Sequence, residues 1–86
     1  MTSVRGTVSE PDGHPVAGAT VRLVAVKSGK TNEMKTAEDG SFSLELIHGV
    51  FAGRFQLGVS KAGYSTSSRD IPAKSREEIN ITLTRP

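Results

Sequence analysis

Apolar and polar residues alternate along most of this chain, which is the period-two pattern typical of half-buried β-strands. The clearest example is residues 41–47, where Phe42, Leu44 and Leu46 share one face while Ser43 and Glu45 share the other. No segment keeps the spacing of an amphipathic helix. The pattern predicts strands over residues 4–9, 19–27, 33–37, 41–47, 54–60, 64–71 and 78–84.

Glycine, proline and aspartate mark the turns between these strands. Residues 10–15 contain Asp-Gly and two prolines, so they predict a turn, and residues 28–32 predict a loop. Glu38–Gly40 predicts a tight hairpin joining strands 33–37 and 41–47. The apolar faces of such short strands stay dry only if two sheets pack together. We therefore predict an all-β fold, a seven-stranded antiparallel Greek-key β-sandwich.

Two of the predicted strands are polar enough to be edge strands. These are residues 33–37 and 64–70, which carry charges and serines in place of an apolar stripe. Charged and polar side chains on an edge hinder pairing with another chain, so we interpret them as edge protection. Self-pairing through these two edges is the alternative.

The length of 86 residues fits one domain, which we assign to residues 1–86. A domain this small has a thin stability margin, and without cysteine it gains no disulfide. The last strand pattern stops at Thr84, almost at the end of the sequence. We therefore expect this domain to be part of a longer protein.

Charge and hydropathy exclude two classes of partner. The net charge is only +2, and Lys27, Lys30 and Lys35 are interleaved with Glu33 and Glu38, so we expect no nucleic-acid surface. No apolar run approaches the ~18 residues of a membrane helix, so we expect no membrane insertion. The strand pattern begins by Val4, which predicts that no secretory leader precedes it.

Four motifs occur in an order that resembles a known family. They are Val4–Val8, Asp12–Leu23, Thr36–Phe42 and Leu57–Tyr64, and together they span nearly the whole chain. The sequence resembles the carboxypeptidase regulatory-like domains, which belong to the transthyretin-like (prealbumin-like) sandwiches. The resemblance implies a non-catalytic accessory module of a larger, exported or cell-envelope protein. Such a module aids folding, spacing or protein contact, so its partners would be other domains of its own chain or another protein.

Most conspicuous residues in these motifs have structural explanations. Gly13 and Gly40 suit turns with positive φ, where glycine alone carries no steric penalty. Tyr64 follows Gly63 at a strand start, where its ring can cap the core and its hydroxyl can reach the backbone or water. Neither role requires a ligand.

Candidate chemistry begins with the two histidines, His14 and His48, both in predicted loops. A metal site needs further ligands, which Asp12 and Asp39 supply only if folding brings the turns together. No serine lies in a Gly-x-Ser-x-Gly motif. We therefore predict no catalytic residue, no cofactor and no metal ligand.

One enzyme shares the broad fold and must be considered. Hydroxyisourate hydrolase ends in Tyr-Arg-Gly-Ser, whereas this chain ends in Leu83-Thr84-Arg85-Pro86. A cleft joining His14 or His48 to Arg22 or Arg54 would revive this hypothesis.

Carbohydrate binding is the main functional alternative. Related sandwiches stack sugars on exposed aromatic rings, but this chain has no Trp and one Tyr. Phe51 is the only aromatic residue outside the alternating pattern, and Val50 and His48 lie beside it in the sequence. These three residues are our candidate contacts for a ligand or partner, and a plug for the open end of the sandwich is the simpler role for Phe51. The sequence does not indicate an oligomeric state.

Overall fold

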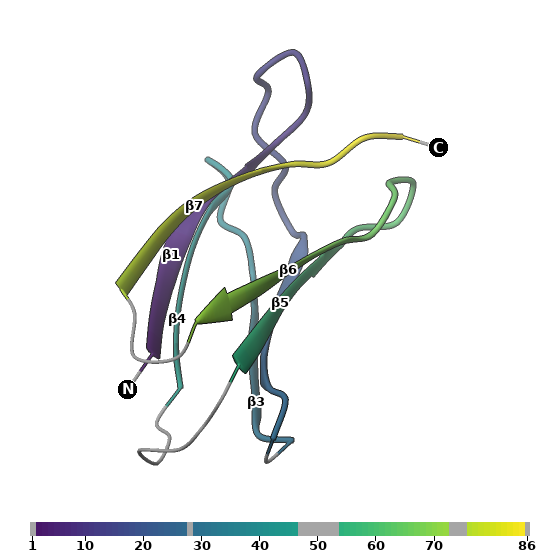
Figure 1. The fold of residues 1–86 in the computed structure, drawn as a ribbon. Helices are drawn as coiled ribbons and strands as arrows, with labels where there is room; N and C mark the ends of the chain where they lie inside the picture. Colours follow the sequence, from purple (N-terminus) through teal and green to yellow (C-terminus); the bar gives the residue numbers. More distant parts are fainter. Residues whose placement is uncertain (1, 28, 47–53, 73–75, 86) are drawn as a thin grey trace.

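A computed structural model describes residues 2–27, 29–46, 54–72 and 76–85 (Figure 1). Their backbone forms seven strands and no helix within these ranges. The strands are β1 (Thr2–Ser9), β2 (Thr20–Ala25), β3 (Thr31–Lys35), β4 (Ser41–Leu46), β5 (Arg54–Ser60), β6 (Ser67–Pro72) and β7 (Arg76–Thr82).

The strands form two sheets, one ordered β4-β1-β7 and the other β3-β2-β5-β6. The predicted all-β sandwich of seven strands is therefore confirmed. The order also places β3 and β6 at the edges of the larger sheet, as the polar patterns predicted. Strand β6 begins later than predicted because the Tyr64 N–H donates to Lys61 O (3.0 Å) and closes a turn there.

One pair departs from the predicted antiparallel arrangement. Strands β1 and β7 run parallel, with Gly6 beside Ile79 and Val8 beside Ile81, whereas the other pairs are antiparallel. Strand β7 forms no hairpin with β6, its neighbour in the sequence, because β6 belongs to the opposite sheet. The chain therefore crosses the sandwich before β7, as a parallel pair requires.

The predicted hairpin at Glu38–Gly40 is also wrong in its pairing. The turn forms, because the Gly40 N–H donates to Ala37 O (2.8 Å) and the Ala37 N–H donates to Ser41 O (3.0 Å). However, β3 pairs with β2 while β4 pairs with β1. This turn therefore carries the chain from one sheet to the other. The hairpin that precedes it in the chain joins β2 to β3.

The core lies between the two sheets and is aliphatic. Its largest fully buried side chains come from both sheets and include Phe55, Leu23, Leu57, Ile71, Leu83, Val4, Val8, Val21 and Val59. On β4, the predicted inward residues Phe42, Leu44 and Leu46 are all buried. The period-two pattern thus identified the core face of the five strands in which it was apolar, whereas β3 and β6 carried no such stripe.

Two glycines are required by close backbone contacts. A Cβ on Gly6 would lie 1.6 Å from Ile79 O in the neighbouring strand β7. Gly40 has a φ of 80°, and a Cβ there would lie 2.4 Å from Val8 O. Gly13 has a φ of 93°, so the predicted positive φ is confirmed at both turn glycines.

The two long sides of the sandwich differ. On one side, side chains of β3 reach the outer edge of β4: Asn32 Nδ2 donates to Glu45 O (2.8 Å), and the Ser43 N–H donates to Met34 Sδ (3.2 Å). The other side has β6 and β7 as its edge strands. Contacts between β3 and β4 therefore join the two sheets along one side. On the other side, β6 and β7 are edge strands of different sheets.

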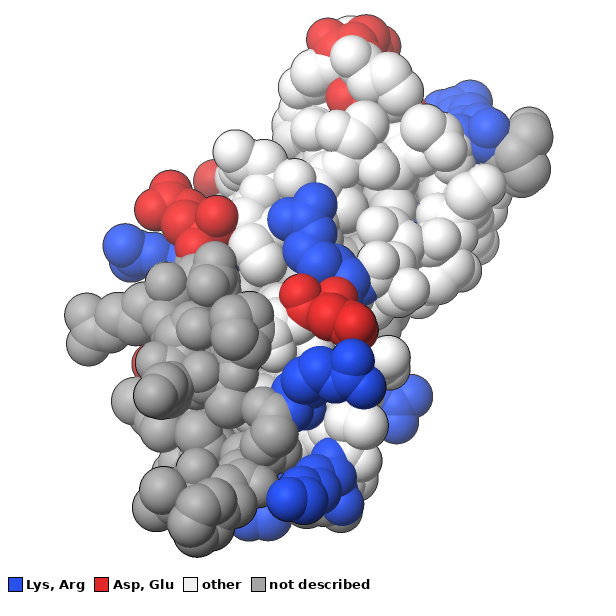
Figure 2. Space-filling view, in the orientation of Figure 1, with Lys and Arg blue, Asp and Glu red and all other residues white. Residues whose placement is uncertain are grey.

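On the face shown in Figure 2, basic side chains gather toward the lower end below one acidic group, and other acidic groups lie elsewhere on the face. One of the contacts between them joins Arg54 to Asp70 at 3.8 Å. Exposed pairs of this kind contribute little to stability. Within the described ranges, no helix has the length and apolar character needed to cross a membrane.

Candidate functional site

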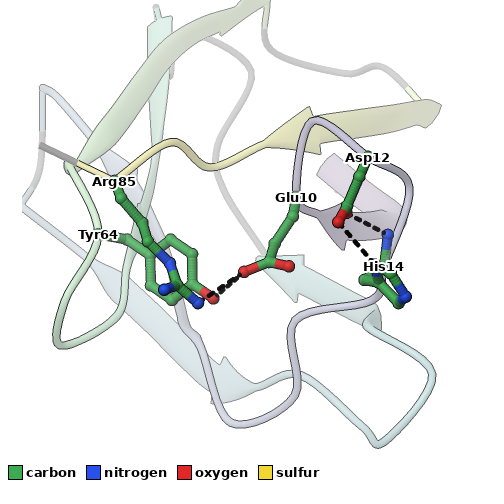
Figure 3. A network of polar contacts seen from close by, with 5 residues as sticks. All are labelled: Glu10, Asp12, His14, Tyr64 and Arg85. Atoms are coloured by element: carbon green, nitrogen blue, oxygen red, sulfur yellow. Dashed lines mark hydrogen bonds and ion pairs between the residues drawn. The ribbon is translucent and has the colours of Figure 1, made fainter.

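Polar side chains gather at the end of the sandwich where β1 stops and β2 begins (Figure 3). They come from three segments: the turn after β1, the connection between β5 and β6, and the extension that follows β7. We call them the end cluster, which consists of Glu10, Asp12, His14, Tyr64 and Arg85.

The turn after β1 explains how Asp12 and His14 meet. The Gly13 N–H donates to Glu10 O and the Glu10 N–H donates to His14 O, both at 2.8 Å. Asp12 Oδ1 then accepts the backbone N–H of His14 at 3.0 Å, as aspartate does in tight turns. The Asp12 and His14 side chains therefore lie side by side, with Oδ2 and Nδ1 2.8 Å apart.

Glu10 links the two sheets at this end. Its Oε1 accepts from the Tyr64 hydroxyl at 2.5 Å and from Arg85 Nη2 at 3.2 Å. The Arg85 guanidinium lies 5.4 Å from the centre of the Tyr64 ring, within the range of a cation–π contact. The Tyr64 ring packs against the core, as predicted. Its hydroxyl bonds to a carboxylate, whereas the sequence suggested the backbone or water.

Hydrogen bonds in the cluster shift the pKa values of exposed groups. The pKa of Asp12 is lowered, first by the backbone N–H of His14 and then by its imidazole. The Asp12 carboxylate in turn raises the pKa of His14. Tyr64 and then Glu10 raise the pKa of Arg85. The cluster therefore stabilises the charged forms of all three side chains.

The cluster also contains three groups that are able to bind a metal. Ligand atoms of Glu10, Asp12 and His14 lie within 4.8 Å of one another. However, Asp12 and His14 bond to each other, and Glu10 is engaged by Tyr64 and Arg85. The side chains of Asp12 and His14 are 59% and 75% exposed. The arrangement is that of an ion pair on an open turn, and the prediction of no metal ligand stays a prediction.

A shallow depression of about 460 Å³ lies beside the cluster, lined by Glu10, Pro11, Asp12, Tyr64, Leu83 and Arg85. Neither arginine of the hydrolase hypothesis lines it. Arg22 is exposed in the middle of β2, and Arg54 begins β5, where it pairs with Asp70. The depression beside the end cluster therefore does not join it to Arg22 or Arg54.

The candidate contact residues Phe51, Val50 and His48 lie outside the described residues. Their proposed role stays a prediction. Sequence reasoning considered Asp12, His14 and Tyr64 separately but missed their convergence with Glu10 and Arg85. Glu10 and Tyr64 are 54 positions apart, and neither carries a local signal that would connect it to the other.

Comparison with solved structures shows the same fold in larger proteins. The Bacillus anthracis TIE protein superposes with a TM-score of 0.74 at 15% identity, over 98% of this chain and 17% of that one. A 3-chlorocatechol 1,2-dioxygenase from Rhodococcus opacus 1CP gives a TM-score of 0.72 at 14% identity, over 99% of this chain and 60% of that one. At these identities the similarity concerns the fold alone.

Comparison of the sequence gives a more specific result. No curated protein matches the chain. The family model of the carboxypeptidase regulatory-like domain matches residues 3–84, which is nearly the whole sequence. That family consists of non-catalytic β-sandwich modules. The resemblance seen in the four motifs is therefore confirmed, and this chain belongs to the carboxypeptidase regulatory-like domain family.

Proposed function

We propose that this domain is a non-catalytic accessory module that holds the neighbouring parts of a larger protein at a fixed spacing. The observation that carries this proposal is the parallel pairing of β1 with β7. Because both strands run in the same direction, the chain enters at one end of the sandwich and leaves at the other (Figure 1). The molecule measures 39 × 21 × 16 Å along its principal axes. Flanking segments would therefore be separated by its long dimension.

Contacts at the exit end support a rigid connection. The Leu83 N–H donates to Ser9 O (2.9 Å), and the Ser65 N–H donates to Thr84 O (2.8 Å). Arg85 then contacts Glu10 and Tyr64 through its side chain. The segment after β7 is thus fixed to both sheets, so a following domain would continue in a defined direction.

The experiment is a replacement in the full-length protein. Residues 3–84 are exchanged for a Gly/Ser linker, which behaves as a flexible coil, and the distances between the flanking parts are measured by small-angle X-ray scattering. We expect a broader distance distribution, with the chemistry of each flanking part unchanged. A control with an unrelated rigid sandwich of similar length should restore the narrow distribution. An unchanged distribution after the linker exchange would contradict the proposal.

Carbohydrate binding through Phe51 is the competing outcome. It is tested by calorimetric titration of the domain with soluble polysaccharides. A saturable heat that Phe51→Ala abolishes would replace the spacer proposal with a binding function. No heat with any polysaccharide is the result that we expect.

A further inference from the structure

The four edge strands of the sandwich are not equally protected against pairing with another chain. An exposed edge offers unpaired N–H and C=O groups that readily accept a further strand. The edges of β3 and β4 lie against each other, because Asn32 and Met34 of β3 bond to backbone groups of β4. Two backbone groups on the edge of β4 are therefore already bonded within the fold.

The edge of β6 is exposed but carries charges that oppose self-pairing. Arg69 lies opposite Leu57 in the ladder, so it is on the core face of the strand, while Asp70 is on the outer face. Two copies of β6 related by a two-fold axis would pair residues of the same face. Pairing centred on Arg69 or on Asp70 would place like charges directly opposite each other, which is destabilising, so only registers centred elsewhere on β6 avoid this repulsion.

The charges of β7 are confined to the start of the strand, at residues 76–78. The run from Ile79 to Thr84 is uncharged, and β7 stands at the outer margin of its sheet (Figure 1). The Leu83 N–H points toward β1, where it donates to Ser9 O, while Thr84 O points away from β1 and accepts from Ser65. Backbone groups alternate in this way along a strand. Those of Glu78, Asn80 and Thr82 therefore face the open edge.

We propose that the β7 edge is an interaction surface for a second copy of this chain. The two β7 strands would pair antiparallel around a two-fold axis at Asn80, joining the three-stranded sheets into one continuous sheet. In this register Asn80 lies opposite Asn80 of the second copy, and Glu78 lies opposite Thr82 of the second copy. All open backbone groups from Glu78 to Thr82 then find partners, and no like charges among these residues oppose each other.

The Asn80 side chain is suited to this position. Its Oδ1 accepts from Thr7 Oγ1 at 2.9 Å on the outer face of the sheet. Among the described residues, no group accepts a hydrogen bond from its Nδ2. At the two-fold axis that amide can donate across the junction, as stacked asparagines do in paired sheets.

One short strand pair buries less area than the ~1,000 Å² of a stable interface, so we expect a weak dimer with a Kd of about 10 µM to 1 mM. Sedimentation equilibrium over that concentration range measures it. Asn80→Lys places two lysines opposite each other and should weaken the dimer roughly tenfold. Thr82→Lys instead places lysine opposite Glu78 of the second copy, so its dimer should be as strong or stronger at low salt. Ser43→Lys, on the same face but on β4, is the matched control and should change nothing.

Circular dichroism confirms that each variant is folded, since all three substitutions are on exposed positions. A wild-type chain that remains monomeric up to about 1 mM would overturn the proposal. A dimer whose Kd is unchanged by Asn80→Lys would also overturn the proposal, because the two copies would then pair through another edge. A dimer weakened by Thr82→Lys as much as by Asn80→Lys would overturn the register.

Discussion

Two regions of this domain, the interior of the sandwich and the end cluster, are held together by polar or backbone contacts. They differ in how far solvent reaches those contacts. Inside the sandwich, Gly6 allows β1 and β7 to approach, and the buried Thr36 joins the bend at residues 16–19 to the end of β3. At the end cluster, most of the charged groups stay in solvent. The interior contacts are few and each lacks a substitute, whereas water can replace most contacts of the cluster. The visible concentration of charge therefore does not mark the most important contacts.

The largest effect should come from Gly6→Ala. A methyl group at this position would lie 1.6 Å from Ile79 O, so the central strand of the smaller sheet must move. Overpacking of this kind costs about 3 kcal/mol or more, a large share of the stability of so small a domain. Denaturant unfolding measures the change.

Gly58→Ala is the matched control for that substitution. Gly58 lies in β5, its φ is not in the left-handed region, and nothing lies within 4 Å of an added Cβ. Its free energy of unfolding should change by less than about 1 kcal/mol. Equal effects at the two glycines would contradict the assignment of the Gly6 effect to contact with β7.

The second effect concerns the Thr36 hydroxyl, whose residue is only 6% exposed. It accepts from the Ala19 N–H at 2.9 Å and donates to Val16 O at 2.6 Å. Thr36→Val keeps the shape but leaves two backbone groups without partners, so we expect a loss of about 2 kcal/mol in the free energy of unfolding. Thr36→Ser keeps the hydroxyl and should lose less. If Thr36→Ser lost more stability than Thr36→Val, packing of the methyl group and not hydrogen bonding would explain the role of Thr36.

The third effect is a loss of stability expected at the end cluster. Tyr64→Phe removes the hydroxyl that donates to Glu10, a side chain that is 22% exposed. Because water reaches Glu10, we expect a loss of about 1 kcal/mol, less than for Thr36→Val. Denaturant unfolding of Tyr64→Phe, Glu10→Gln and the double variant gives the coupling between them. Additive losses would show that the hydroxyl and carboxylate act independently.

The difference between local patterns and long-range contacts explains what the sequence could predict. Period-two alternation identified the core face of β4, and Asp-Gly pairs located two turns. Alternation does not specify which strands pair, so the β3–β4 hairpin and the all-antiparallel sheets were wrong.

Contacts between distant segments were equally invisible. Thr36 lay within a recognised motif, but its hydrogen bonds span 17 and 20 residues and depend on the folded bend at 16–19. The Glu10–Tyr64 contact spans 54 residues and gives no local signal at all. Local chemistry predicted local structure, and the polar contacts of the site required the assembled sandwich.

The smallest effect is expected at the Asp12–His14 pair, which is open to solvent. The pKa of His14 is raised from its ordinary value of 6.5, so its contribution is complete below that value and is lost as the pH rises through the raised pKa. The pKa of Asp12 is lowered from 3.8, so its contribution is present above that value and is lost as the pH falls through the lowered pKa. Both side chains therefore contribute fully to stability between pH 3.8 and pH 6.5.

An NMR titration of the imidazole signals tests this pair directly. We expect His14 to titrate above 6.5, and Asp12→Asn to move its midpoint back toward that value. If Asp12→Asn left the His14 midpoint unchanged, Asp12 would order the backbone of the turn without affecting the protonation of the His14 imidazole. Because screening by salt weakens exposed pairs, the shift should also shrink as the ionic strength rises.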